Sequence, residues 1–168
     1  MHHLTRLMIT IFLLATIAAC STNEYHLIHH RHLLCHDIKT RLERSGIEVL
    51  EYGDNISVIL PTDAFFATNS ARLDEDRKLN LEDIVMWIRS SPRAEVEISA
   101  YTDNVGHENF KQDLSDRQAH SIAAFLWAHG IHHTRLKVNG YGSENAVASN
   151  RSTLGSSFNR HIEIHWLK

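Results

Sequence analysis

The sequence predicts a two-layer α/β (α+β) sandwich in which helices pack on one face of a sheet. Two segments, Leu81–Ile88 and Ala119–Leu126, carry apolar residues at the i, i+3, i+4, i+7 spacing of an amphipathic helix. Other segments alternate apolar with polar residues, as in Val96–Ala100, which is typical of a strand with one buried face. Strands and helices alternate along the chain, an order that favours a sheet covered by helices.

The segment before the predicted sheet has the pattern of a helix from about Leu27 to Arg44. Leu27, Leu34, Ile38 and Leu42 recur at roughly helical spacing, and Gly46 is a good C-terminal stop. The other face of this helix is basic and rich in histidine. The sequence leaves open whether the helix packs on the domain that follows or on a partner.

Beyond Gly46 the chain predicts the strands and helices of the sandwich. Strands at Ile47–Val49 and Ile56–Leu60 flank a Tyr52–Asn55 turn, and Pro61 ends the second strand. The remaining predicted elements are a helix from near Asp74 to before Pro92, the strand Val96–Ala100, a helix that stops at Gly130, a strand with Leu136 and Val138, a short turn of helix, and a last strand with Ile162, Ile164 and Trp166 facing inward.

The first nineteen residues have the pattern of a secretory signal peptide. Arg6 supplies the positive start, and the apolar run Leu7–Ala19 is shorter than the roughly 20 residues that span a bilayer. The Ile-Ala-Ala-Cys ending resembles a bacterial lipobox, which implies cleavage before Cys20 and its acylation, palmitate included. In Gram-negative lipoproteins, a serine directly after the acylated cysteine, here Ser21, accompanies delivery to the outer membrane. The alternative is a plain signal peptide whose cleavage site happens to precede a cysteine.

Composition limits the partners of the mature chain, Cys20–Lys168, which has the size of one domain. The formal net charge of −3 gives no electrostatic case for binding nucleic acid or an anionic membrane surface. Cys35 is the one other cysteine, so acylation of Cys20 excludes an internal disulfide. Cys35 is then either an inert residue on a buried helix face or the site of an intermolecular bond.

The fourteen histidines raise the question of a metal site. Five of them fall within one short segment: His26, His29, His30, His32 and His36. No carboxylate or cysteine completes a typical zinc spacing there, and histidines continue through the whole chain. A compositional bias explains this spread better than a site, so the sequence predicts neither a metal nor a cofactor.

Six motifs occur in order and together resemble OmpA-like peptidoglycan-binding domains. They are F-x-x-x-S-A-x-L within Phe65–Leu73, a strand and T-D-x-x-G loop at Val96–Gly106, L-S and A of L-S-x-x-R-A at Leu114–Ala119, G-Y-G at Gly140–Gly142, the loop Val147–Asn150, and a closing segment with Gly155, Asn159-Arg160 and Ile162–Ile164. The resemblance covers about Asp54 to Lys168. It implies a β-α-β-α-β-β domain over residues 54–168, with helices on one face of a mixed sheet, after a signal peptide (1–19) and a lipidated tether with its helix (20–53).

The resemblance implies non-covalent binding of the diaminopimelate side chain of the peptidoglycan stem, which carries both an ammonium and a carboxylate. In the family the Asp of T-D-x-x-G and the Arg of L-S-x-x-R-A bind these two groups. Asp103 is that Asp, although an Asp beside Gly106 can also simply cap a turn. The implied binding residues are Thr102, Asp103, Asn104, Gly106, Lys111, Arg117, Gln118, Asn159 and Arg160.

The cationic half of this pattern is altered. The family Arg, fifteen residues beyond Asp103, is Gln118, and Arg117 lies about 100° away around the helix. Loss of a charged pair would cost on the order of 1.5–3 kcal/mol of binding. Lys111, where the family favours Asn, restores the charge if it enters the pocket; otherwise Lys111 and Arg117 are ordinary solvated surface residues. The closing segment also departs, with Ser156 and His161 in place of frequent arginines.

Two functions remain as hypotheses. One is an outer-membrane lipoprotein that faces the periplasm and tethers the envelope, or a secretion apparatus, to peptidoglycan. The other is a structural subunit with a weakened site, because Ile56–Leu73 also resembles the OmpA-like lipoprotein of Dot/Icm type IVB secretion systems, which implies envelope proteins as partners. An enzyme is not predicted, since no Gly-rich phosphate loop, nucleophile elbow or metal-ligand motif occurs.

Overall fold

The computed structural model describes residues 33–168, which form parts of two compact units, Met1–Asp37 and Ile38–Lys168. The described residues of the first unit, 33–37, are helical. The predicted signal peptide, Cys20 and the histidines before Leu33 lie outside the described residues. The fold is therefore that of the second unit, Ile38–Lys168.

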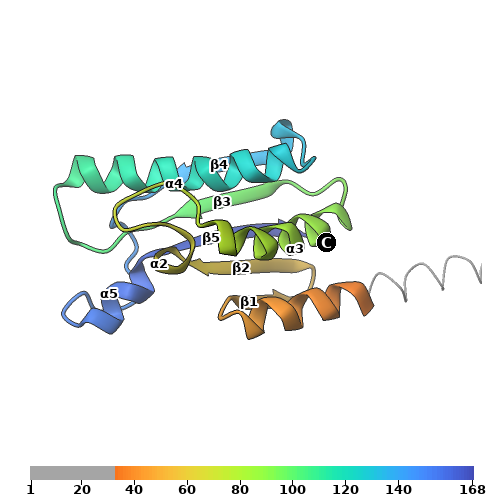
Figure 1. Cartoon of the computed structure of the whole chain (residues 1–168), viewed down its shortest axis with the longest axis horizontal. Helices are drawn as coiled ribbons and strands as arrows, with labels where there is room; N and C mark the ends of the chain where they lie inside the picture. Colours follow the sequence, from red (N-terminus) through yellow and green to blue (C-terminus); the bar gives the residue numbers. More distant parts are fainter. Residues whose placement is uncertain (1–32) are drawn as a thin grey trace, which may run out of the picture. The chain divides into compact units, whose positions relative to one another are not determined.

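A five-stranded mixed sheet forms one layer of this unit (Figure 1). Its spatial order is β1-β2-β5-β3-β4, with β3 and β4 parallel and the other neighbours antiparallel. The strands are β1 (Glu48–Tyr52), β2 (Asn55–Pro61), β3 (Val96–Ala100), β4 (Leu136–Gly140) and β5 (His161–Leu167). The last strand of the chain thus lies at the centre of the sheet and brings the closing motif next to the T-D-x-x-G loop.

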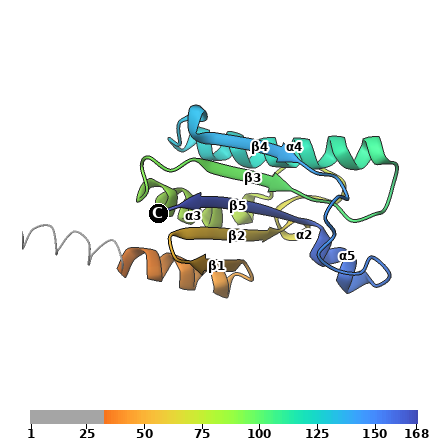
Figure 2. The same cartoon turned by 180° about the vertical axis from the view of Figure 1, so that it is seen from behind.

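The helices form the second layer. The two long helices, α3 (Lys78–Arg89) and α4 (Glu108–Ala128), lie on the same face of the sheet, and Figure 2 shows the opposite face in front of them. The shorter helical segments are α2 (Thr62–Phe65), η1 (Glu75–Arg77), η2 (His133–Arg135) and α5 (Thr153–Asn159). The predicted two-layer arrangement, with helices on one face of a mixed sheet, is confirmed. No helix in residues 33–168 has the length and apolar character that crossing a membrane requires.

The core lies between these layers and is built from the alternation that the sequence shows. Ile98 pairs in register with Ile164, and both are fully buried. Trp87 of α3 meets Trp166 of β5 edge to face, with ring centroids 5.6 Å apart and both residues 1% exposed. Aromatic pairs in this geometry add about 0.5–1.5 kcal/mol beyond the area that they bury.

The unit extends upstream of the family motifs. Ile38 and Leu42 are fully buried, and the Arg41 guanidinium binds both carboxylate oxygens of Asp83 in α3, at 2.9 and 2.6 Å. The strand β1 pairs with β2 along its whole length. The compact unit therefore begins earlier than the boundary at Asp54 that the motifs suggest, because residues 38–53 complete the core and one edge of the sheet.

Candidate functional site: a pocket where β3 meets α4

A pocket of about 520 Å³ lies at the carboxyl end of β3. Three stretches and one arginine from the end of α5 form its wall. The lining residues are Thr62, Asp63, Phe66, Ala67, Thr68, Asn69, Tyr101, Thr102, Asp103, Val105, Gly106, Phe110, Lys111, Leu114, Gln118 and Arg160. The pocket thus joins the segment after β2, the T-D-x-x-G loop and the start of α4.

The T-D-x-x-G loop is held in place by hydrogen bonds that its backbone N–H groups donate. The N–H of Thr102 donates to the carbonyl of Gly142 at 2.7 Å, and the N–H of Val105 donates to Asp103 Oδ1 at 2.9 Å. Gly106 has a φ of +103°, a backbone region that glycine occupies without the penalty of a side chain. Asp103 therefore does cap the turn, and the same carboxylate also lines the pocket.

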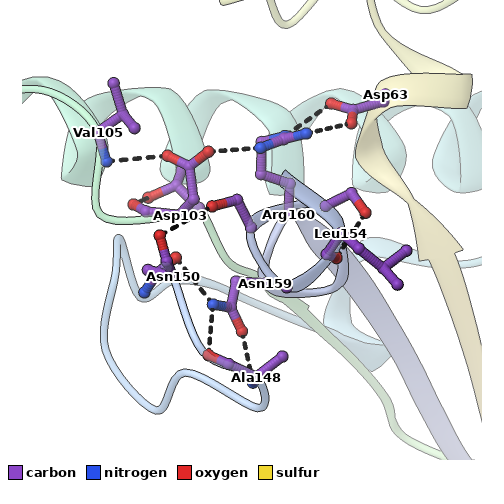
Figure 3. Close-up of polar contacts among 12 residues, drawn as sticks. Asp63, Asp103, Val105, Ala148, Asn150, Leu154, Asn159 and Arg160 are labelled. Atoms are coloured by element: carbon purple, nitrogen blue, oxygen red, sulfur yellow. Dashed lines mark hydrogen bonds and ion pairs between the residues drawn. The ribbon is translucent and has the colours of Figure 1, made fainter. Parts of the chain in front are cut away.

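Arg160 lies between two carboxylates (Figure 3). Its Nε and Nη2 bind Asp63 at 2.8 and 2.5 Å, and its Nη1 binds Asp103 at 2.5 Å. These hydrogen bonds, that to Asp63 most of all, raise the pKa of Arg160 above its ordinary value in spite of partial burial. Three of the five N–H groups of the guanidinium are thus used, and two remain for a ligand.

Asn159, the residue before Arg160, holds the loop Ala148–Asn150 in place by hydrogen bonds (Figure 3). It is 1% exposed, its Oδ1 accepts the N–H of Ala148 at 2.9 Å, and its Nδ2 donates to Ala148 O and Asn150 Oδ1, each at 2.9 Å. Asn159 does not line the pocket. These hydrogen bonds fix the backbone next to Arg160, which explains why Asn159 belongs to the motif.

Gln118 lines the pocket, but its side-chain amide donates a hydrogen bond within the protein. Its side chain donates to the carbonyl of Ser70 at 2.9 Å, and the residue is 2% exposed. One turn of helix further on, the Ser121 hydroxyl donates to the carbonyl of Ala71 at 2.7 Å. Gln118 therefore ties α4 to the F-x-x-x-S-A-x-L segment, where the family pattern has a charged ligand.

Lys111 enters the pocket wall, whereas Arg117 does not. Lys111 is 6% exposed, and its Nζ lies 2.6 Å from Ser143 Oγ and 2.7 Å from Glu108. Arg117 is half exposed and pairs with Asp113 at 2.8 Å. The solvated-surface alternative thus describes Arg117 and not Lys111. Asn104 is exposed and, like Arg117, is not among the lining residues.

Sequence reasoning did not find Asp63 or the aromatic neighbours of the pocket. Asp63 meets Arg160 across 97 positions of sequence, and no motif links them. Tyr101 stacks on His161 and on Tyr141, at centroid distances of 4.7 and 5.2 Å. Burial and, next, the negative charge of Glu163 raise the pKa of Tyr101. The family motifs mark His161 only as a departure.

Among residues 33–168, no group of three or more His, Cys, Asp or Glu residues is arranged to hold a metal ion. Four of the five clustered histidines, His26 to His32, lie outside the described residues.

The comparisons with known proteins agree on one family. Residues 65–160 match the model of the OmpA family. The "Probable lipoprotein YiaD" of Escherichia coli is 30% identical over 127 residues, which are 76% of this chain and 58% of that protein. The "Outer-membrane lipoprotein YfiB" of Pseudomonas aeruginosa is 30% identical over 123 residues, 73% of this chain and 72% of that protein. The chain therefore spans just over half of the first relative.

Two further comparisons concern the cell wall. The "Peptidoglycan-binding protein ArfA" of Mycobacterium tuberculosis is 38% identical over 77 residues, 46% of this chain and 24% of that protein. Among solved structures, the cell wall anchor of the T6SS from Pseudomonas aeruginosa superposes with a TM-score of 0.71 and 23% identity, over 78% of this chain and 94% of that one. The structural likeness shows the fold, and it agrees with the motifs.

Proposed function

Because the chain belongs to the OmpA family, we propose that its pocket binds the diaminopimelate side chain of peptidoglycan non-covalently. The observation that carries the proposal is the charge of the pocket lining. It has two carboxylates, Asp63 and Asp103, and two cations, Lys111 and Arg160. The ligand side chain is a neutral zwitterion, so a pocket lined by equal numbers of positive and negative groups complements it.

The anionic half of the proposed site is Asp103 with Asp63 beside it. A carboxylate has about four acceptor positions, and Asp103 uses one on Val105 and one on Arg160. The remaining positions can accept N–H groups of a ligand ammonium. The turn and Arg160 hold the carboxylate in place, so little side-chain entropy is lost when the ligand binds.

Co-sedimentation with purified diaminopimelate-type sacculi tests the proposal. We expect the wild-type domain to sediment with the sacculi, and an excess of the soluble diaminopimelate tripeptide to release it. Gln118→Arg should be run in parallel, because it restores the family cation. Binding by Gln118→Arg together with no wild-type binding would overturn the proposal.

That outcome would favour a second candidate, a structural subunit of a type IVB (Dot/Icm) secretion complex that uses the fold as a protein-interaction module. The observation that favours it is the hydrogen bond from the Gln118 amide to the Ser70 carbonyl. At the position where the family has a ligand-binding arginine, the side chain here links two parts of the fold instead. The segment resembling those lipoproteins, Ile56–Leu73, supplies one wall of the pocket. Its partners would be envelope proteins around the secretion channel.

We further propose attachment to the outer membrane, facing the periplasm, through lipid on Cys20. The lipobox pattern supports this part of the proposal, as does the similarity to two proteins named as lipoproteins. Each buried CH₂ of an acyl chain adds about 0.8 kcal/mol, so a multiply acylated cysteine stays in the membrane.

Substitution of the lipidated cysteine should release the protein. We expect Cys20→Ser to move the chain from the outer-membrane fraction to the soluble periplasmic fraction, as measured by immunoblotting of separated fractions. Cys35→Ser is the matched control and should stay in the membrane. Membrane retention of Cys20→Ser would contradict the lipid anchor.

A further inference from the structure

Lys111 is the one buried lysine or arginine among residues 33–168, with 8% of its side chain exposed. Burial of an ammonium is costly unless it is paired and hydrogen-bonded, so a buried lysine in a pocket wall needs an explanation. The family pattern offers none, because it favours a neutral Asn at this position.

The ammonium of Lys111 is bound directly after the G-Y-G motif, which is hydrogen-bonded to the T-D-x-x-G loop. Its Nζ donates to Ser143 Oγ at 2.6 Å. The residue before Ser143, Gly142, accepts the N–H of Thr102, which precedes Asp103. Ser143 thus follows directly on the residue that is hydrogen-bonded to the T-D-x-x-G loop, and Lys111 itself lines the same pocket as that loop.

The second partner of Lys111 is a carboxylate that solvent reaches freely. Glu108 lies one helical turn earlier, 2.7 Å from Nζ, and 69% of its side chain is exposed. Because most of its side chain is exposed, water can solvate the Glu108 carboxylate when another carboxylate pairs with Nζ. Glu108 thus puts a displaceable carboxylate group directly on the buried ammonium.

We propose that Lys111 is the carboxylate subsite of this pocket, and that Glu108 occupies it until the ligand carboxylate takes its place. The inference rests on the proposed function and supplies the cation that Gln118 lacks. An ammonium has three N–H donors, of which Ser143 uses one and the carboxylate a second. The geometry makes Lys111 a specificity-determining residue for stems with a free carboxylate on the side chain.

Stem peptides with lysine in place of diaminopimelate separate this role from general binding. Lysine keeps the side-chain ammonium but lacks the neighbouring carboxylate. The probes are therefore the soluble tripeptides L-Ala-γ-D-Glu-meso-diaminopimelate and L-Ala-γ-D-Glu-L-Lys, titrated by calorimetry into the same protein. We expect the wild type to prefer the diaminopimelate peptide by about tenfold or more, the usual effect of one charged hydrogen-bonded pair.

Two substitutions at this ion pair should act in opposite directions. Lys111→Met keeps the length of the side chain but removes its charge, and should lower affinity for the diaminopimelate peptide about ten- to a hundredfold with little change for the lysine peptide. Glu108→Gln removes the competing carboxylate and should raise affinity for the diaminopimelate peptide several-fold. Asp113→Asn, an exposed acid on the same helix paired with Arg117, is the control and should change neither.

The possible outcomes separate a failure of this inference from a failure of the proposed peptidoglycan binding. A wild type that binds neither tripeptide nor sacculi overturns the proposed function. A wild type that binds while Lys111→Met keeps the preference for diaminopimelate overturns the inference alone. Equal losses for both peptides in Lys111→Met, with a lowered melting temperature, would assign Lys111 a structural role and also reject the inference.

Discussion

Asp103→Ala is expected to reduce binding to diaminopimelate-type sacculi at least tenfold and up to about a hundredfold, as loss of a charged hydrogen-bonded pair does. The substitution removes the acceptor for the ligand ammonium. It also frees Arg160 on one side, because Nη1 then loses its partner while Asp63 still holds Nε and Nη2. The loss of the Asp103 charge and the less compensated charge of Arg160 both disfavour a ligand ammonium in the pocket. Co-sedimentation with sacculi at increasing protein concentration measures the loss of binding.

Two controls separate binding from folding in this experiment. Asp113→Ala removes an aspartate of α4 that is 62% exposed and pairs with Arg117 at the surface, so this variant should bind like the wild type. Asp103→Asn retains an oxygen for the N–H of Val105 and should keep the turn but not the affinity. Asp103→Ala that melts like the wild type and still binds normally would exclude Asp103 from the site.

The fold could be predicted because each of its elements carries a local pattern. Ile98 and Ile164 alternate with polar neighbours, and both face the helices, as period-two alternation requires. The same patterns do not state which strands pair. The position of β5 between β2 and β3 is therefore seen only in the structure and could not be read from the apolar spacing. The contribution of residues 38–53 was open for the same reason, since Arg41 and Asp83 meet only in the folded chain.

The candidate site was predictable where its residues are contiguous. Thr102, Asp103 and Gly106 belong to one turn, whose sequence fixes its shape. Spacing alone could not orient the side chains of α4. Lys111 and Gln118 are both buried, yet the Lys111 ammonium binds the Ser143 hydroxyl, whereas the Gln118 amide donates to a backbone carbonyl.

Gly140→Ala is expected to lower the free energy of unfolding by about 3 kcal/mol or more. A Cβ at this position would lie 2.3 Å from the backbone N of Asp116 and 2.6 Å from Ser115 Oγ, both in α4. Backbone atoms cannot move aside, so α4 must shift away from β4, and such overpacking costs about 1–3 kcal/mol. The shift would also weaken the hydrogen bonds from the Gly140 N–H to Asp116 and from Gln112 to the Gly140 carbonyl, about 0.5–1.5 kcal/mol each.

Thermal unfolding measures this effect, and a fall in Tm of about 10 °C is expected for a domain of this size. Asn139→Ala is the matched control, because its side chain is exposed on the same strand and should leave Tm unchanged. The same shift should weaken peptide binding at temperatures where Gly140→Ala is still folded, since Gln112 and Ser115 hold the part of α4 that carries Lys111. An unchanged Tm would mean that α4 and β4 can separate by the width of a methyl group, and the G-Y-G motif would then need an explanation other than close packing.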